Sequence, residues 1–473
     1  MKTAITIGLA AVALCVAAGC GRKHEGRTVG GWTADLKSQD DAARRKAVAT
    51  LGKMGPEAVP ALIRALADKD ATARVNAAEA LGKIRPAAKD AAPALVKALG
   101  DEDYDVRVNA VAALGSIGPA SIPPLIEGLR NPDANTRKNA AEALGKIGPA
   151  AKEAVPVLCE ALKDGDYAVR KNALTALAAI EPSSPEALPA FRAALKDTSM
   201  FVRRSAVAAL VAAGPAAAPA LGEALGDEDH DICETAAVSL EALGAAAVPA
   251  LIDALEGEDT EAHRLAAELL VKVGPAATNA VSALVKVLQD DDSSVRASAV
   301  TALAAMGPAA QAAVPALVDV LRDGDDRVSS DASKALEKLG RGAVSALVGA
   351  LKFESVEARR LAVKILLAIE VGQQDGAWRD AVPALIEGLS DADRQVCGGV
   401  IKVLGRIGPP AVPALIQTLD DKDENVCGNA ARALGDAGPA AKAAVPALNQ
   451  TLSRAQTDRL RRCARVALER IGK

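Results

Sequence analysis

Apolar residues recur at helical spacing along almost the whole chain. Within Val59–Leu66 they fall at positions i, i+3, i+4 and i+7, and within Val106–Ile117 at i, i+4, i+7, i+8 and i+11. Each pattern places the apolar side chains on one face of a helix. Between the two kinds of segment stand short polar stretches rich in Gly, Pro and Asp. The pattern therefore predicts pairs of short amphipathic helices.

The same pair is repeated down the chain. The string AVPALIRALADKDATARVNAAEALGKI, which begins at Ala58, returns in recognisable form at Ala381 and again at Ala411. Successive copies are mostly 30 or 33 residues apart, and with a truncated copy near Trp32 they make fourteen helix pairs. A helix pair that cannot bury its apolar face alone must stack on its neighbours. We therefore predict an all-α fold, an α-solenoid with a right-handed superhelix of about fourteen pairs over residues 32–473.

This pattern resembles HEAT repeats, in particular the short bacterial variety that is named after phycobilin lyases. The resemblance rests on the A-V-P start of each copy, the Asp-x-Asp turn and the Arg that follows it, and it extends from Trp32 to Lys473. It implies the fold with high specificity. It says almost nothing about function, because one fold can carry many functions.

The first residues have the features of a secretory signal. Lys2 precedes an apolar stretch, and small residues lead to a cysteine in Ala17-Ala18-Gly19-Cys20. This segment resembles a bacterial lipobox, which implies cleavage after residue 19, a lipid on Cys20 and a polar tether over residues 20–31. Gly21 favours sorting to the outer membrane, facing the periplasm of the bacterial cell envelope. The alternatives are an ordinary cleaved signal and an uncleaved transmembrane helix, for which the apolar stretch is short.

Composition bears both on how the interior is packed and on which partners are disfavoured. Half of the residues are hydrophobic, yet aromatic residues make up only 1%, so the interior must be filled by Ala, Leu and Val. Small side chains suit helices whose axes lie close together. The formal net charge is −4, with both signs interspersed. This balance disfavours a general nucleic-acid binder.

Most repeats carry Asp-x-Asp before the second helix and an Arg in its first turn. The nearer Asp is placed to cap the helix, which is worth about 1 kcal/mol. In HEAT repeats the farther Asp and the Arg form a ladder through the stack, and the resemblance implies the same here. We prefer this role to a row of calcium sites, because these turns are too short to wrap an ion. The residues of three such sets are Asp68, Asp70, Arg74, Asp101, Asp103, Arg107, Asp164, Asp166 and Arg170.

Departures from the repeat are the places to look for binding. The position three residues before the Arg holds both tyrosines of the chain, and the second helices of HEAT arrays line the concave surface. Its residues either form a contact row for a protein partner or only cover the start of a helix. The candidates are Tyr104, Tyr167, Met200 and His230.

An insertion at Gly372–Asp380 is a second departure, and it carries Trp378. It suggests a docking loop or a flexible joint, and a neutral insertion explains it equally well. Trp378 is therefore a further candidate for contact with a partner.

No catalytic constellation is recognisable. His230, Cys233 and His263 suggest zinc ligands, but they lie on neighbouring helices and no CxxC motif supports them. Deoxyhypusine hydroxylases, which are HEAT-type enzymes, use repeated His-Glu pairs, and this chain has only His24-Glu25. No residue that handles a chromophore in phycobilin lyases can be assigned either.

We therefore expect no cofactor, no metal and no nucleic acid. The leading hypothesis is a membrane-tethered scaffold for unknown protein partners. An enzyme related to the two HEAT-type families and an envelope protein that binds a glycan or another ligand are the alternatives.

Overall fold

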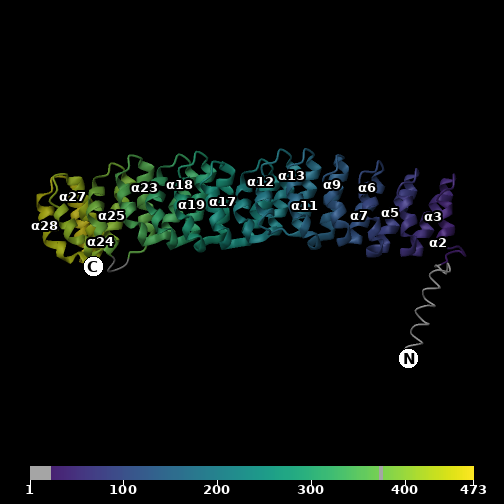
Figure 1. The fold of residues 1–473 in the computed structure, drawn as a ribbon. Coiled ribbons are helices and arrows are strands. Elements are labelled where there is room, and N and C mark those ends of the chain that lie inside the picture. The colour runs from purple at the N-terminus through teal and green to yellow at the C-terminus, as the bar shows by residue number, and fades with distance from the viewer. Residues whose placement is uncertain (1–22, 372–375, 473) are drawn as a thin grey trace, which may run out of the picture. The chain divides into compact units, whose positions relative to one another are not determined.

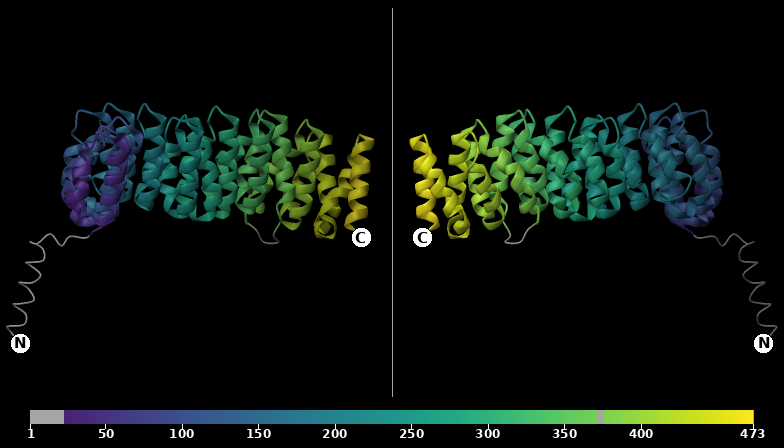
Figure 2. Two further views of the ribbon diagram at one scale, coloured as in Figure 1. Left: turned by 90° about the vertical axis from the view of Figure 1, so that its right-hand side faces the viewer. Right: turned by 90° about the vertical axis from the view of Figure 1, so that its left-hand side faces the viewer.

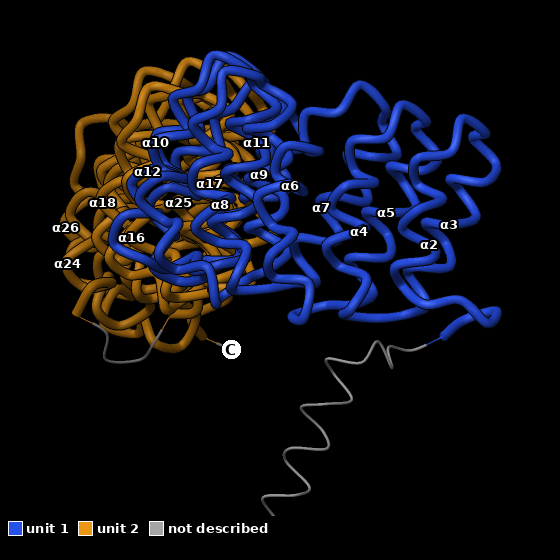
Figure 3. Tube along the Cα trace, turned by 45° about the vertical axis from the view of Figure 1, so that its right-hand side comes forward, with its two compact units in different colours: residues 1–236 blue, residues 237–473 orange. Residues whose placement is uncertain are grey.

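The computed structural model describes residues 23–371 and 376–472, and the described part is helical throughout (Figure 1). It divides into two compact units, residues 1–236 and 237–473, with the boundary inside α15 (Figure 3). The first unit contains α2 (Val29–Asp35), α3 (Asp41–Met54), α4 (Val59–Ala65), α5 (Ala71–Ile84), α6 (Ala92–Ala98), α7 (Tyr104–Ile117), α8 (Ile122–Gly128), α9 (Ala134–Ile147), α10 (Val155–Ala161), α11 (Tyr167–Ile180), α12 (Ala187–Ala194), α13 (Met200–Ala213) and α14 (Ala218–Glu223).

After α15 (His230–Leu243), the second unit contains α16 (Val248–Leu255), α17 (Thr260–Val273), α18 (Val281–Val287), α19 (Ser293–Met306), α20 (Val314–Asp319), α21 (Asp326–Leu339), α22 (Val344–Gly349), α23 (Val356–Ala368), α24 (Gly376–Glu387), α25 (Arg394–Ile407), α26 (Val412–Thr418), α27 (Glu424–Ala437), α28 (Val445–Arg454) and α29 (Asp458–Ile471). The described residues contain no strand, only an isolated bridge between His24 and Arg27.

The helices form the fourteen pairs that the repeat predicts, from α2–α3 to α28–α29. Within each unit a short first helix packs on the longer second helix of its own repeat, and consecutive second helices pack side by side (Figures 1 and 2). In the first unit this order is α3, α5, α7, α9, α11 and α13. The prediction of an all-α solenoid of HEAT-type pairs is confirmed.

The connectors explain the two repeat lengths. The second helix of most repeats ends at a Gly with positive φ, such as Gly118 at 80°, a conformation that glycine adopts without strain. A short 3-10 helix follows, either η1 (Pro56–Ala58) in a short connector or the longer η4 (Gly148–Ala154) in a long one. The Pro of A-V-P then occupies the first turn of the next helix, where its missing N–H costs nothing.

The other connectors contain similar 3-10 helices, and several first helices end in one. These are η2 (Arg85–Ala91), η3 (Pro119–Ser121), η5 (Gly214–Ala217), η6 (Ala224–Gly226), η7 (Gly244–Ala247), η8 (Gly274–Ala280), η9 (Gly307–Ala313), η10 (Val320–Arg322), η11 (Gly340–Ala343), η12 (Ala350–Lys352), η13 (Gly388–Ser390), η14 (Pro409–Ala411) and η15 (Gly438–Ala444).

A ladder of ion pairs joins consecutive repeats. Arg170 donates from Nε and Nη2 to the carboxylate of Asp197 in the next repeat, at 2.7 and 2.8 Å, and from Nη1 to the backbone oxygen of Asp164 at 2.8 Å. Such bidentate charged hydrogen bonds are the strong ones. An Arg–Asp ion pair at 2.7 or 2.8 Å likewise joins Arg44 to Asp68, Arg74 to Asp101, Arg137 to Asp164, Arg203 to Asp227, Arg296 to Asp323 and Arg359 to Asp391.

The ladder departs from the prediction in two of the named sets. Asp103 and Asp166 accept backbone N–H groups as helix caps, but the side chain of Asp70 caps nothing and instead pairs with Arg45 at 3.0 Å. Arg107 holds backbone oxygens of its own turn, because the acidic position of the next repeat is Asn131.

At most of the remaining steps the two ladder partners are lost together, but Cys397 stands opposite Asp421, where only the Arg is lost. Ser329 stands opposite Phe353, and Cys427 stands opposite Ala455. Neither pair leaves a charge without its partner in the stack.

Close helix packing accounts for the recurrent glycines. A Cβ built on Gly82 would lie 3.1 Å from the Cα of Ala113 on the next second helix, and one on Gly145 would lie 3.1 Å from the Cα of Ala176. Real Cβ atoms rarely come so close to backbone. These glycines are therefore required by contact between neighbouring second helices, as their recurrence predicts.

The segment assigned to a tether is shorter than predicted. Trp32 is buried at the start of the first repeat, and its Nε1 donates to the backbone oxygen of His24 at 3.1 Å. Arg27 lies 4.5 Å over the Trp32 ring and pairs with Asp35 at 2.6 Å. Residues 24–31 are thus part of the first repeat. Cys20 and the signal segment lie outside the described residues.

Three apolar stretches of the described chain have the length and hydropathy of membrane spans, at 200–226, 230–255 and 293–322. Each is a second helix that continues through a connector into the next first helix. Gly214, Gly244 and Gly307, all with positive φ, interrupt them. Buried Ala, Leu and Val contribute part of their hydropathy, with a third to just over half of each apolar window inside the repeats.

Candidate functional site

The row predicted as a contact surface is exposed. Tyr104, Tyr167, Met200 and His230 are each the first residue of their second helix, in the first unit. This position directs the side chain away from the helix pair, so that 68% of Tyr104 and 49% of Tyr167 remain accessible to solvent. We call the exposed residues Tyr104, Tyr167, Met200, Phe201 and His230 the amphipathic row.

Contacts inside the amphipathic row keep its aromatic groups in place. The rings of Tyr167 and Phe201 lie 6.0 Å apart between centroids, and the guanidinium of Arg107 lies 5.6 Å from the ring of Tyr104. Phe201 is 53% exposed, and the sequence analysis missed it. The sequence could have indicated Phe201, because it directly follows Met200 and is one of only three Phe in the chain. The structure therefore extends the row by one aromatic residue.

Trp378 does not belong to a contact surface. Its side chain is buried to 99%, and its Nε1 donates to the backbone oxygen of Glu370 at 3.3 Å. The ring is therefore part of the interior near the start of α24. The prediction that Trp378 contacts a partner is wrong, because a large apolar side chain in an insertion can close a gap in the interior as well as bind. Residues 372–375 of the insertion lie outside the described part.

The residues considered for zinc have other roles. The two ring nitrogens of His263 lie 2.8 Å from the carboxylate of Asp290 and 3.0 Å from the backbone oxygen of Gly257, so His263 takes the place of the ladder Arg. Cys233 donates from Sγ to the backbone oxygen of Asp227. The described residues contain no group of three or more His, Cys, Asp or Glu able to hold a metal ion.

The cysteines of the described repeats are free thiols. Cys233 and Cys427 are buried, and Cys159, Cys397 and Cys463 are half-buried. Burial raises the pKa of the Cys159, Cys397 and Cys427 thiols above the ordinary value. These three are therefore poor nucleophiles at neutral pH.

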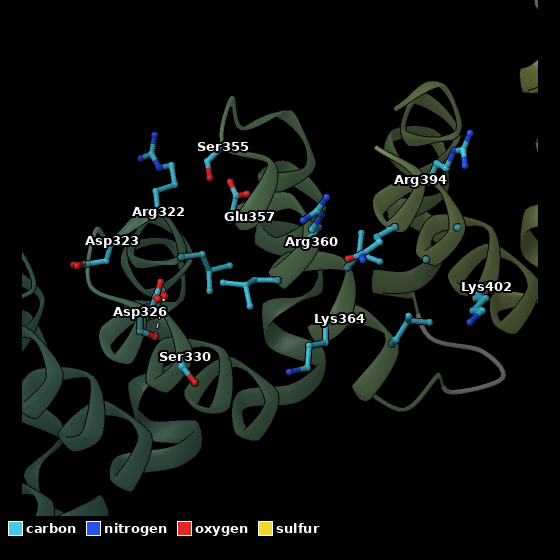
Figure 4. Close-up of a pocket in the computed structure, with 18 of the residues that line it drawn as sticks. Arg322, Asp323, Asp326, Ser330, Ser355, Glu357, Arg360, Lys364, Arg394 and Lys402 are labelled. Atoms are coloured by element: carbon cyan, nitrogen blue, oxygen red, sulfur yellow. Dashed lines mark hydrogen bonds between the residues drawn. The ribbon is translucent and has the colours of Figure 1, made fainter. Parts of the chain in front are cut away.

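The second unit contains a hollow that the sequence analysis missed. It has a volume of about 1070 Å³ and lies along the second helices α21, α23, α25 and α27. Figure 4 shows Arg360 and Lys364 from α23 beside Arg394 and Lys402 from α25. We call this hollow the basic groove. The cationic residues that line it are Arg322, Arg360, Lys364, Arg394, Lys402 and Arg432, and the acidic ones are Asp323, Asp326 and Glu357, so cations outnumber carboxylates by six to three.

Most of these cations have no acidic partner. Arg360 pairs with Asp393 at 2.6 Å, and Arg322 pairs with Asp319 at 2.8 Å while lying over the ring of Phe353. Within residues 23–371 and 376–472, the remaining four make no ion pair. They are Lys364, Arg394, Lys402 and Arg432.

Two irregularities of the repeat open the basic groove. The ladder is absent between α21 and α23, where Ser329 and Phe353 replace Arg and Asp, and α21 packs on α23 less extensively than on α19. On α25, Gly399 approaches α23 so closely that a Cβ on it would lie 2.0 Å from Cγ1 of Val363. Gly398, the residue before it, faces open space and leaves the floor of the groove without a side chain.

The sequence did contain a signal for the groove. The fifth residue after the ladder position is cationic in four consecutive second helices, as Lys334, Lys364, Lys402 and Arg432. In eight preceding repeats the same position is never cationic. Its occupants there are Glu79, Ala112, Glu142, Thr175, Ala208, Val238, Glu268 and Thr301.

Comparison with known proteins gives one family. The sequence profile described as HEAT repeats matches residues 31–106, 92–167, 155–244, 248–337 and 382–469. No curated protein sequence matches the chain.

Several solved structures are similar to this chain at low identity. Importin β crystallised in an ammonium sulfate condition is 15% identical, over 95% of this chain and 75% of its own, with a TM-score of 0.37. Kap121p bound to Ste12p is also 15% identical, with a TM-score of 0.42, over 93% of this chain and 56% of its own. An engineered protein is 24% identical over 88% of this chain and 99% of its own, with a TM-score of 0.22.

Proposed function

The chain belongs to the HEAT-repeat family, and from this premise we propose that it is a non-catalytic scaffold for protein–protein interactions, tethered to a membrane of the bacterial cell envelope. The observation that carries this proposal is the amphipathic row on the second helices of the first unit. The low identity to the solved structures adds nothing to it. We also assign the chain to the short bacterial variety of the repeat, on the pattern of its A-V-P copies.

The physical argument concerns exposed aromatic side chains. The chain has only seven aromatic residues, two Trp, two Tyr and three Phe. Both Trp are buried, whereas both Tyr and Phe201 are about half exposed or more. Tyr is enriched among the residues that dominate binding energy at protein interfaces, because it combines a large apolar area with a hydrogen-bonding group. Rings exposed to this extent bury less of their apolar area than the Ala, Leu and Val of the interior, and so add less to the stability of a repeat than their size allows.

The tether is the second part of the proposal. The proposed signal segment covers residues 1–19 and is cut before Cys20, and the first repeat includes Trp32 with the residues from His24 that pack on it. A lipid on Cys20 would then lie only about four residues from folded chain, at most about 14 Å. Several acyl chains hold a protein durably at a bilayer. The first repeat would be kept next to the membrane, and we place it at the outer membrane, facing the periplasm.

Affinity purification from native membranes after mild crosslinking tests the scaffold. The test variant carries Tyr104→Ala, Tyr167→Ala and Phe201→Ala, and the matched control carries Val211→Ala and Val466→Ala, which are exposed apolar residues outside the row. We expect a defined protein to be enriched with the wild type and the control and lost with the test variant. Equal recovery with all three proteins would contradict a role of the row.

Fractionation of cells tests the tether separately. Cys20→Ser removes the only thiol that can carry the lipid at the predicted cleavage site, so the protein should move from the membrane to the soluble fraction. Mass spectrometry of the wild-type N-terminal peptide should show an acylated Cys20. An unmodified N-terminus together with unchanged fractionation of Cys20→Ser would overturn the lipid anchor but leave the scaffold untouched.

A further inference from the structure

The basic groove lies in the second unit, apart from the amphipathic row of the first unit, and we propose that it binds an extended acidic segment of a partner protein. This inference rests on the proposed function, since it assigns a partner chemistry to a second surface of the scaffold. It is carried by three observations: unpaired cations, their regular spacing, and an apolar floor.

The cations are available to a ligand. Lys364, Arg394, Lys402 and Arg432 are exposed and line the groove without an acidic partner among the described residues. The chain as a whole is acidic at −4, so a local excess of positive charge departs from its average. Like charges collected on one surface repel each other, and an anionic ligand removes that repulsion. Charge complementarity therefore selects an acidic occupant.

The spacing of the cations selects an elongated occupant. Lys364, Lys402 and Arg432 hold the same position in three consecutive second helices, whose axes lie about 8–10 Å apart. A single phosphate or headgroup cannot reach cations spread over this distance. A peptide in the extended polyproline II conformation advances about 3.1 Å per residue and completes a turn every three residues, so every third side chain lies on the same face and meets the next cation. The expected ligand therefore carries Asp or Glu at about every third residue.

The floor of the groove favours a peptide over a nucleic acid. Leu361 and Leu367 are half-buried, and the missing side chain of Gly398 leaves room between them and α25. An apolar side chain of the ligand fits there. Binding of single strands relies on aromatic side chains that stack on bases, and the residues that line the groove include none.

Fluorescence anisotropy with the full chain tests the proposal. The probe is a labelled peptide of about ten residues with Glu at every third position and a central Leu, about 31 Å long in the polyproline II conformation. A control peptide contains the same residues with its Glu grouped at one end. A labelled oligothymidylate measures any preference for nucleic acid. We expect the periodic peptide to bind most tightly, with an affinity that falls as the salt concentration rises.

Matched variants locate the binding site. Lys364→Ser with Lys402→Ser should weaken binding of the periodic peptide about tenfold. Lys338→Ser with Lys422→Ser changes the net charge equally at exposed lysines outside the groove and should leave binding unchanged. Gly398→Met keeps the charge and fills the floor, so it should also weaken binding.

Several results would overturn the proposal. They are no binding of the periodic peptide, equal binding of the two peptides, equal effects of the two lysine pairs, or tighter binding of the oligothymidylate that is lost with Lys364→Ser and Lys402→Ser. None of these results depends on the amphipathic row. If the peptide does not bind but a partner is lost with the row variants, only the inference about the basic groove is refuted. If the peptide binds as expected but the row variants recover the same proteins as the wild type, only the proposed contact surface of the scaffold is refuted.

Discussion

Two adjacent glycines of α25 should respond in opposite ways to the same substitution. Alanine in place of glycine inside a helix stabilises it by about 1 kcal/mol, because glycine loses more conformational freedom on folding. Gly398 faces open space, with no atom within 4 Å of a Cβ built on it. Gly398→Ala should therefore stabilise the protein by about 1 kcal/mol.

Gly399→Ala has the same gain in helix propensity but a steric cost. Its Cβ would lie 2.0 Å from Cγ1 of Val363, and Val363 is buried on α23, where a β-branched side chain has almost one rotamer. Forcing extra volume into such a contact costs about 1–3 kcal/mol. The net effect should be a loss of up to about 2 kcal/mol, and the two alanine variants should differ by about 1–3 kcal/mol.

Hydrogen exchange resolved to α25, together with urea unfolding, measures both effects. Peptide-resolved exchange is needed because long repeat arrays do not always unfold as one unit. Val363→Ala removes Cγ1, so Gly399→Ala should be less harmful in that background, with a coupling of about 1 kcal/mol or more. If Gly399→Ala slows exchange as much as Gly398→Ala, or if the coupling is zero, the described approach of α25 to α23 is wrong.

Three further predictions concern the rest of the fold. Hydrogen bonds from Arg137 and Arg296 hold the pKa of Asp164 and Asp323 below the ordinary value. These carboxylates therefore stabilise the folded state above about pH 4 and lose that contribution as the pH falls through their folded pKa. The urea concentration at the unfolding midpoint should decrease once the pH is below about 4, and a midpoint concentration unchanged down to about pH 3 would contradict the ladder. Trp378→Ala should lower the free energy of unfolding by about 3–5 kcal/mol and abolish protection from hydrogen exchange in α24. Unchanged stability would show that the Trp378 side chain is not buried. Cys427 should react with iodoacetamide at pH 8 much faster in urea than in the native protein, and equal rates would show that its burial is wrong.

The repeat could be predicted because it is encoded locally. Apolar spacing within some 30 residues sets each helix pair, and the Asp-x-Asp turn with its Arg sets the contact to the next. The exposure of Tyr104 and Tyr167 follows from the same logic, since the first residue of a second helix occupies the same place in every repeat.

The errors arise where local pattern does not determine the path of the chain. Polar, Gly-rich residues before Trp32 suggested a tether, but Arg27 and the backbone of His24 hold them to the Trp32 ring. Trp378 lies in an insertion without a counterpart in other repeats, so nothing in the sequence indicated whether its ring points inward. Asp70 has the sequence of a cap but pairs with Arg45 of the preceding repeat.

The basic groove was missed for a different reason. Lys364 and Lys402 are ordinary residues within their own repeats and become unusual only when the same position is compared from repeat to repeat. The hollow itself depends on the loosened packing of α21 on α23, which no single repeat encodes. A comparison of one position across all copies of the repeat reveals the row of cations. It does not reveal the cavity.

Site-specific photocrosslinking in living cells tests the central claim most directly. A photoreactive phenylalanine analogue placed at Tyr167 or Phe201 lies within the amphipathic row, and one placed at Glu153 is also exposed but lies in a connector. A scaffold that binds through the row should give one protein adduct of defined mass from both row positions and none from Glu153. The same adducts from all three positions, or none from any, would contradict the account.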